Sequence, residues 1–292
     1  PTPMVLRASA MVTKLLDWKQ TRTDPQAVKA VRQEVDDLAS VGTWDASTLC
    51  ERDDLIAWAQ KKGIKIHVGE GLPICSIKFA EMHASKHKYK GRFCFRTPTT
   101  RDEGGALAVF QEMSSRPTTI VALNVALAYG MIFGHKCSTV DAIKAYVQSD
   151  LKSLHPTYLE IPKYLCPADW KHMKRPVVQL KKALYGHPEA GGHWERHLEA
   201  IIKKLGGQAV KDHPSCFWFP KPLWLFMIVY VDDLFLSGPA DKHVDMWKAL
   251  GAEVNLEPAE DLDRYLGRHH HFQPFNRLSY SLIDHFVSPV EC

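Results

Sequence analysis

The chain has 292 residues, of which 45% are hydrophobic and 24% are charged. This length allows one large domain or two modest ones with a proper core, and the composition excludes a disordered chain. The net charge is only +4, which excludes a strongly basic protein but permits binding to nucleic acid.

The cysteines and the apolar runs exclude further classes of protein. The seven cysteines are scattered and form no CxxC pair, so neither a disulfide framework nor a zinc ribbon is expected. The longest apolar run, 223–231, is too short to span a bilayer, and the N-terminus lacks a signal-peptide pattern. We expect an intracellular protein, cytoplasmic or nuclear, that is not secreted and does not bind membranes. Because the chain starts at Pro1, we also expect a piece of a longer chain.

The first expected helix begins at Pro25, where Asp24 can cap it, and Gly42 can end it. Its buried stripe comprises Val28, Val31, Val35 and Leu38. Two strands are expected next, at 64–68 and 72–79. The basic stretch 78–96 follows and is typical of a hairpin with cationic arms.

The second half of the chain mixes helices and strands. We expect a helix at 117–133 that is buried on nearly every side and an amphipathic helix at 192–205, with Trp194, Leu198, Ile201 and Leu205 on one face. Val244, Trp247 and Leu250 suggest a short helix. Strands are expected at 137–141, 224–230, 234–237 and 265–272. Because helices and strands intermix without strict βαβ alternation, the predicted class is α+β.

The segment 228–238, IVYVDDLFLSG, is the strongest indication of function. It places Asp232 and Asp233 at the turn between two apolar strands, where a turn alone would favour Asn-Gly or Asp-Gly. Adjacent carboxylates repel each other, but a divalent cation would stabilise them. The alternative is a solvated acidic turn.

A third carboxylate, Asp141, ends an apolar strand and precedes an aromatic residue, Tyr146, by five positions. Phosphoryl transfer by two metal ions needs carboxylates from at least two strands. Asp141 would supply the second strand's contribution. The alternative role for Asp141 is that of a helix N-cap.

These motifs together resemble the reverse transcriptase domain of Ty1/copia-type retrotransposons over roughly residues 25–275. The matching segments, in chain order, are EVDDLASVGTW (34–44), the HKYKGRF stretch, DAIKAY (141–146), SDL (149–151), TYLEIP (157–162), QLKKALYGHPEAGGHW (179–194), DHPSCFWF (212–219), YVDD (230–233) and DLDRYLG (261–267). Their shared order and spacing make the resemblance specific.

The resemblance implies a right-hand polymerase with palm and fingers, an antiparallel palm sheet and a thumb that is short or absent. The implied division is an N-terminal extension (1–23), a fingers-like region with part of the palm (24–136), the palm with the catalytic carboxylates (137–275) and a C-terminal segment (276–292) forming a truncated thumb or connection. The implied partners are an RNA or DNA template with primer, deoxynucleoside triphosphates and other segments of a longer polyprotein.

The resemblance also implies roles for individual residues. Asp141, Asp232 and Asp233 would bind two Mg²⁺ ions, for which Mn²⁺ could substitute. Tyr146 would lie beneath the sugar and exclude a 2′-hydroxyl, with an ordinary core aromatic as the alternative. The remaining roles fall to Lys78 and Arg92 at the triphosphate, Tyr185 and Gly186 at the template–nucleotide pocket, and Leu266 and Gly267 near the primer end.

Two points remain open in this interpretation. Lys78 and Arg92 could equally be solvated strand charges, and Lys86, Lys88 and Lys90 compete for their role. The family's L-K-Q-A-P after Tyr-Gly is replaced by His-Pro-Glu-Ala-Gly at 187–191, which bears on substrate affinity more than on metal binding. The leading hypothesis is an RNA-directed DNA polymerase. The second is a catalytically weak or inactive retroelement-derived module that binds nucleic acid or has a structural role. The third is a decaying element copy without function.

Overall fold

The computed structural model describes residues 13–111, 118–266, 268–273 and 277–281. These residues form a mixed helix and sheet fold with several sheets. The helices are α1 (Trp18–Thr23), α2 (Pro25–Ser40), α3 (Arg52–Lys62), α4 (Ile120–Gly130), α5 (Ala190–Lys204) and α6 (His243–Gly251). Within this part of the chain, no helix combines the length and apolarity needed to cross a membrane.

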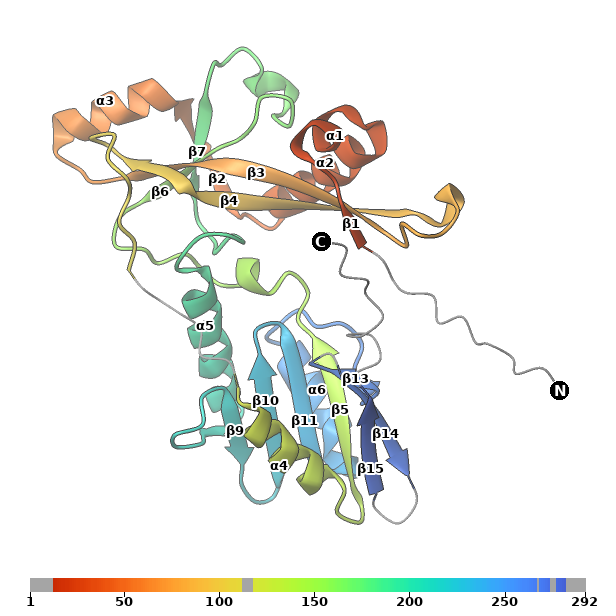
Figure 1. Ribbon diagram of the computed structural model, residues 1–292. Helices are drawn as coiled ribbons and strands as arrows, with labels where there is room; N and C mark the ends of the chain where they lie inside the picture. Colours follow the sequence, from red (N-terminus) through yellow and green to blue (C-terminus); the bar gives the residue numbers. More distant parts are fainter. Residues whose placement is uncertain (1–12, 112–117, 267, 274–276, 282–292) are drawn as a thin grey trace.

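The first sheet has the strand order β1-β3-β6-β7-β2, with β4 paired to β3. Its strands are β1 (Thr13–Leu15), β2 (Trp44–Glu51), β3 (His67–Lys78), β4 (Lys88–Asp102), β6 (Thr157–Glu160) and β7 (Pro176–Leu180). Figure 1 shows this sheet in the upper half of the molecule, with α1, α2 and α3 around it.

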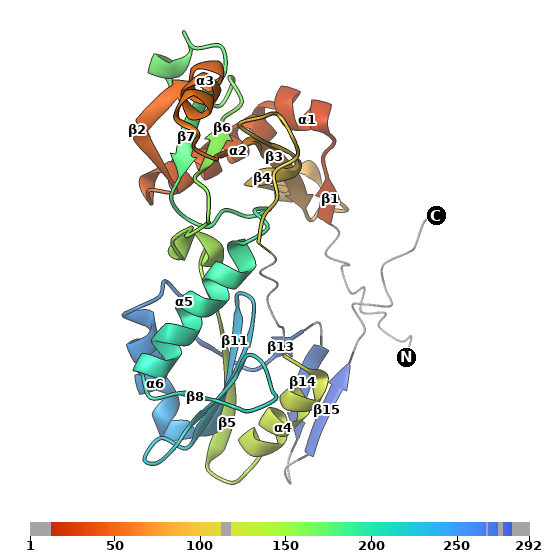
Figure 2. The same ribbon diagram turned by 90° about the vertical axis from the view of Figure 1, so that its left-hand side faces the viewer.

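The second sheet has the order β12-β5-β11-β10-β9-β8 and lies in the lower half of Figure 1. Its strands are β5 (His135–Asp141), β8 (Gln208–Ala209), β9 (Cys216–Phe219), β10 (Leu225–Tyr230), β11 (Asp233–Pro239) and β12 (Glu260–Asp261). Helices α5 and α6 cover one face of this sheet and α4 the other. Figure 2 shows α5 crossing the sheet and reaching up towards the first one.

Helix α2 forms where its sequence predicts. The Asp24 side chain accepts hydrogen bonds from the backbone N–H groups of Gln26 and Ala27, and the helix begins at Pro25. Val31, Val35 and Leu38 of the expected stripe are buried in the core against β4, together with Ala27, whereas Val28 is only half-buried. Contact is close because Gly91 lacks a side chain: a Cβ there would lie 2.3 Å from the backbone oxygen of Ala30.

The two strands expected at 64–68 and 72–79 are in fact one strand, β3, and Ile64 lies before it. Glycines interrupt the apolar alternation, but they do not end the strand. A Cβ at Gly69 or Gly71 would lie within 2.3 Å of the ring of Phe95 or Phe93. These glycines therefore make room for the aromatic rings of β4.

Helix α4 corrects a second expectation. It spans Ile120–Gly130 rather than 117–133, and Pro117 lies outside the described residues. The helix is not buried on every side, because Val121 and Val125 keep 59% and 57% of their surface exposed. Only the face with Leu123 and Leu127 packs against the second sheet.

The strand expected at 265–272 is also corrected, because the chain turns within it. Leu266 has φ +48° and separates β13 (Arg264–Tyr265) from β14 (Arg268–Gln273). With β15 (Arg277–Ser281), these strands form a third sheet in the order β13-β14-β15.

The domain boundary expected at 136/137 does not coincide with a division between the first two sheets, since β6 and β7 belong to the first sheet.

Candidate active site

The turn between β10 and β11 is a tight two-residue connection. Tyr230 and Asp233 are paired across the hairpin, so only Val231 and Asp232 form the turn. Val231 has φ +57°, a left-handed conformation that costs a residue other than glycine about 1–2 kcal/mol. For a β-branched residue it is a true outlier, and the surrounding contacts must hold it.

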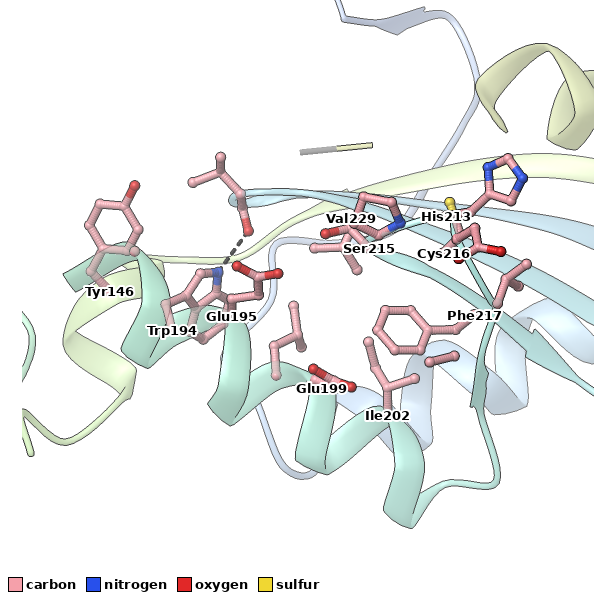
Figure 3. A pocket seen from close by; sticks show the side chains of 17 residues that line it. Tyr146, Trp194, Glu195, Glu199, Ile202, His213, Ser215, Cys216, Phe217 and Val229 are labelled. Atoms are coloured by element: carbon pink, nitrogen blue, oxygen red, sulfur yellow. Dashed lines mark hydrogen bonds between the residues drawn. The ribbon is translucent and has the colours of Figure 1, made fainter. Parts of the chain in front are cut away.

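Two hydrogen bonds fix the backbone of this turn. The indole Nε1 of Trp194, on α5, donates to the carbonyl oxygen of Val231 over 2.7 Å, as Figure 3 shows. The backbone N–H of Ala142 donates to the carbonyl oxygen of Asp232 over 2.8 Å. The hairpin is therefore tied to α5 on one side and to the end of β5 on the other.

The structure places Asp141 beside Asp233. The two are direct partners in the antiparallel pairing of β5 with β11, so their side chains lie on one face of the sheet. Burial, followed by the negative charges of Asp141 and Asp232, raises the pKa of Asp233 to about 7. The third carboxylate, Asp232, is exposed at the turn.

These carboxylates suit a hard cation, although they do not enclose one. Within the described ranges, no group of three or more His, Cys, Asp or Glu side chains is gathered in a way that could hold a metal ion. Mg²⁺, however, is usually bound through one or two carboxylates together with substrate phosphates. The Asp141–Asp233 pair offers such oxygens, and a cation between them would relieve the repulsion that, after burial, raises the pKa of Asp233.

Tyr146 and Tyr185 form one wall of the site. Their ring centroids lie 4.8 Å apart with an interplanar angle of 51°, and both side chains are half-buried. Burial and then the charge of Asp232 raise the pKa of both phenols. Two residues predicted for the nucleotide pocket are thus in contact with each other and within electrostatic range of the hairpin carboxylate.

A row of cations lies on β3 and β4. In their antiparallel pairing, Ser76 is opposite Lys90 and Ile74 is opposite Arg92. The pKa of Lys90 is lowered by burial, then by Arg92 and Lys78, and is partly raised by Glu34 and Asp232. The predicted pair Lys78 and Arg92 is therefore joined by Lys90, which the sequence indicated only as a competitor, and Lys90 is close enough to the hairpin for the charge of Asp232 to act on it.

Gly186 follows Tyr185 in a conformation that needs glycine. Its φ is +84°, and a Cβ would lie 2.3 Å from the backbone oxygen of Phe95. The backbone N–H of Phe95 also donates to the backbone carbonyl oxygen of Tyr185 over 2.7 Å. This close approach joins β4 to the segment before α5.

The stretch 187–191, where the sequence departs from the family pattern, is a buried polar cluster. Glu189 accepts hydrogen bonds from the Ser153 hydroxyl and the Gln111 backbone N–H. His187 lies between Phe95 and Phe110, with ring centroids about 5 Å away. The altered residues thus pack the segment before α5 against the first sheet.

Leu266, predicted near the primer end, packs at the edge of the apolar cluster between α4 and the second sheet. Gly267 lies outside the described residues. Tyr265, which precedes Leu266, was not predicted as a site residue, yet its hydroxyl donates to the Asp233 backbone oxygen over 3.3 Å. Of the supporting residues, sequence reasoning also missed Trp194, which it identified only as part of an apolar stripe.

A cavity of about 420 Å³ lies behind the hairpin, between α5 and strands β9 and β10. Figure 3 shows its lining, with Tyr146 and Trp194 at one end and His213 and Phe217 at the other. The cavity reaches Val231 but does not include the predicted metal-binding carboxylates. It is therefore a space beside the site rather than the site itself.

Comparison with known proteins gives distant relatives among yeast transposon polyproteins. The chain is 24% identical over 258 residues to the transposon Ty1-GR3 Gag-Pol polyprotein of Saccharomyces cerevisiae, which covers 88% of this chain and 13% of that polyprotein. The Ty1-DR5 Gag-Pol polyprotein of the same yeast is 24% identical over 237 residues, or 81% of the chain and 12% of the polyprotein. No family model matches the chain. The chain spans about an eighth of these relatives' length, and the similarity supports a Ty1-type retrotransposon origin.

Proposed function

We propose that the chain is a reverse transcriptase, an RNA-directed DNA polymerase that extends a primer 3′-hydroxyl with deoxynucleoside triphosphates on an RNA or DNA template. The observation that supports this most is the arrangement around the hairpin. Asp141 and Asp233 lie opposite each other with Asp232 beside them, and the charge of Asp232 acts on Tyr146, Tyr185 and Lys90.

In this proposal the second sheet is the palm and the first sheet forms most of the fingers. Helix α5 and the Tyr185–Gly186 segment connect the two. The edge formed by Tyr265 and Leu266 would support the primer end, since Tyr265 bonds to the backbone of Asp233. The fold assignment rests on this arrangement and on the motifs of the sequence.

The residues divide the chemistry of nucleotidyl transfer between them. Asp141, Asp232 and Asp233 would hold Mg²⁺, and the chemistry that a bound ion would supply there is activation of the attacking hydroxyl and stabilisation of the triphosphate charge. Lys90 and Arg92 would bind the phosphates from the other side, because cations stabilise charge that develops on transferred groups. The Tyr146 ring would exclude a ribose 2′-hydroxyl, and the rigid turn would hold the carboxylates in place before substrate binds.

Primer extension tests this function directly. The protein is incubated with poly(rA)/oligo(dT) and dTTP, with Mg²⁺ and Mn²⁺ compared, and dGTP serves as the mismatched control. We expect extension with dTTP and little with dGTP. Binding of primer–template without extension under either metal would instead favour the alternative of an inactive nucleic-acid-binding module.

A further inference from the structure

Lys144 lies between two predicted site residues, Asp141 and Tyr146, and reaches across to α2. It has φ +50° and precedes the short 3₁₀ helix Ala145–Gln148. Its Nζ lies 2.8 Å from a Glu34 carboxylate oxygen and 3.0 Å from an Asp37 carboxylate oxygen. One lysine therefore joins the loop after β5 to the helix that covers the first sheet.

The two acidic partners differ in their surroundings. The Glu34 side chain is 16% exposed and the Asp37 side chain 44% exposed. Asp37 has a second partner, since the Gln33 amide donates to it over 2.8 Å. Burial lowers the pKa of Lys144, but its hydrogen bonds to both carboxylates outweigh this and raise it, so Lys144 stays charged.

Glu34 acts on the same groups as the hairpin carboxylate. The charges of Glu34 and Asp232 both raise the pKa of Lys90, and both raise the pKa of Tyr185. Geometry agrees: α2 touches β4 at Gly91, between Lys90 and Arg92, where a Cβ would lie 2.3 Å from the Ala30 backbone oxygen. Glu34 is four residues after Ala30 in α2, so it lies one helical turn from this contact, at the border of the cation row. Without Lys144, its negative charge would compete with a phosphate for the nearby cations.

The cations themselves are available to a ligand. Among the residues that the structure describes, neither Lys90 nor Arg92 forms an ion pair. Arg92 does act on Tyr185, whose pKa it lowers against the larger effect of burial. A triphosphate bound by these side chains would therefore be repelled by the charge of Glu34 if that charge were not neutralised.

We propose that Lys144 is a positioning residue that neutralises Glu34 at the border of the nucleotide site, and so keeps Lys90 and Arg92 available to the triphosphate. This inference rests on the proposed polymerase function. It assigns Lys144 a role that the resemblance does not, and it distinguishes Glu34 from Asp37, although both bind the same lysine.

The test compares the KM for dTTP with kcat in four proteins: the wild type, Lys144→Met, Lys144→Met/Glu34→Gln and the matched control Asp37→Asn. A mostly buried carboxylate that is left without its counter-charge near a bound phosphate is worth about one factor of ten in affinity. We expect Lys144→Met to raise the KM about tenfold with kcat changed less than about threefold. The second substitution should restore the KM, and Asp37→Asn should leave it unchanged.

A measurement without catalysis separates this inference from the proposed function. Isothermal titration with inorganic tripolyphosphate should show the same order, with about tenfold weaker binding in Lys144→Met and recovery in the double variant. If the proteins bind tripolyphosphate in this order but the wild type extends no primer, the polymerase proposal alone would be overturned. An unchanged KM and unchanged tripolyphosphate binding in Lys144→Met, or a failure of Glu34→Gln to restore them, would overturn the role of Lys144.

Discussion

Replacing Trp194 with phenylalanine tests whether α5 holds the Val231–Asp232 turn in its conformation. The change keeps most of the ring but removes the Nε1–H that donates to the Val231 oxygen. A partly buried carbonyl that loses its partner costs roughly 1–3 kcal/mol. Since 1 kcal/mol shifts Tm by about 2–4 °C in a domain of this size class, we expect Tm to fall by about 2–12 °C.

The effect on activity should exceed what unfolding explains. Val231 is held in a left-handed conformation that costs about 1–2 kcal/mol, so without the bond the turn can relax and move Asp232 and Asp233. If the 1–3 kcal/mol is lost from the transition state, the rate falls roughly 5- to 160-fold. Single-turnover extension at saturating dTTP, at a temperature where the variant is fully folded, measures this.

Leu198→Ala is the matched control. Leu198 lies on the same face of α5, is buried and lines the same cavity, but its side chain cannot donate a hydrogen bond. Its loss should cost about 2–5 kcal/mol of stability while the rate per folded molecule stays near that of the wild type. If Trp194→Phe behaved like Leu198→Ala, with a lower Tm and an unchanged rate, the reasoning about the turn would be refuted.

Three further predictions concern the Tyr146 ring, the close approach of Gly186 to the Phe95 backbone and the dependence of stability on pH. Tyr146→Ala should raise the ratio of ribonucleotide to deoxyribonucleotide incorporation, whereas a mere packing residue would show an unchanged ratio and a loss of about 3–5 kcal/mol in stability. Gly186→Ala should lower both Tm and extension, because its Cβ would meet the Phe95 oxygen, and equal Tm values for variant and wild type would contradict this. His243 is buried, accepts a hydrogen bond from the Ser138 hydroxyl at Nδ1 and donates from Nε2 to the Gly238 oxygen, and burial lowers its pKa to about 4. Because the unfolded chain binds this proton near pH 6.5 and the folded one does not, about 3 kcal/mol of stability present above pH 6.5 is lost as the pH falls to 4. Denaturant unfolding at several pH values should show this loss. In His243→Gln the loss of stability between pH 6.5 and 4 should be smaller by about 3 kcal/mol.

Local signals predicted several elements well. Asp24 and Pro25 mark the start of α2 because capping and proline geometry act within one turn. The apolar stripe with Trp194 and Leu198 predicted α5, and the strands around Val231 formed the expected hairpin. These features depend on residues that are neighbours in sequence, which is why a single sequence contains them.

Other features depend on partners far along the chain. Gly69 and Gly71 resemble strand ends until the Phe95 and Phe93 rings are seen to occupy their space. The exposure of Val125 depends on which face of α4 meets the second sheet. Lys144 gives no local sign of its role, because its partners Glu34 and Asp37 lie more than 100 residues away.

In the proposed function Asp233, which is paired with Asp141 between β5 and β11, would hold the Mg²⁺ that primer extension requires. The most direct measurement is the single-turnover rate of dTTP addition to poly(rA)/oligo(dT) in Mg²⁺ by the wild type and by Asp233→Asn. Metal-ion stabilisation of several kcal/mol corresponds to about 100-fold or more in rate. We therefore expect Asp233→Asn to lose at least about 100-fold while its circular dichroism spectrum matches the wild type. A folded Asp233→Asn protein that extends the primer at near wild-type rate would contradict the account.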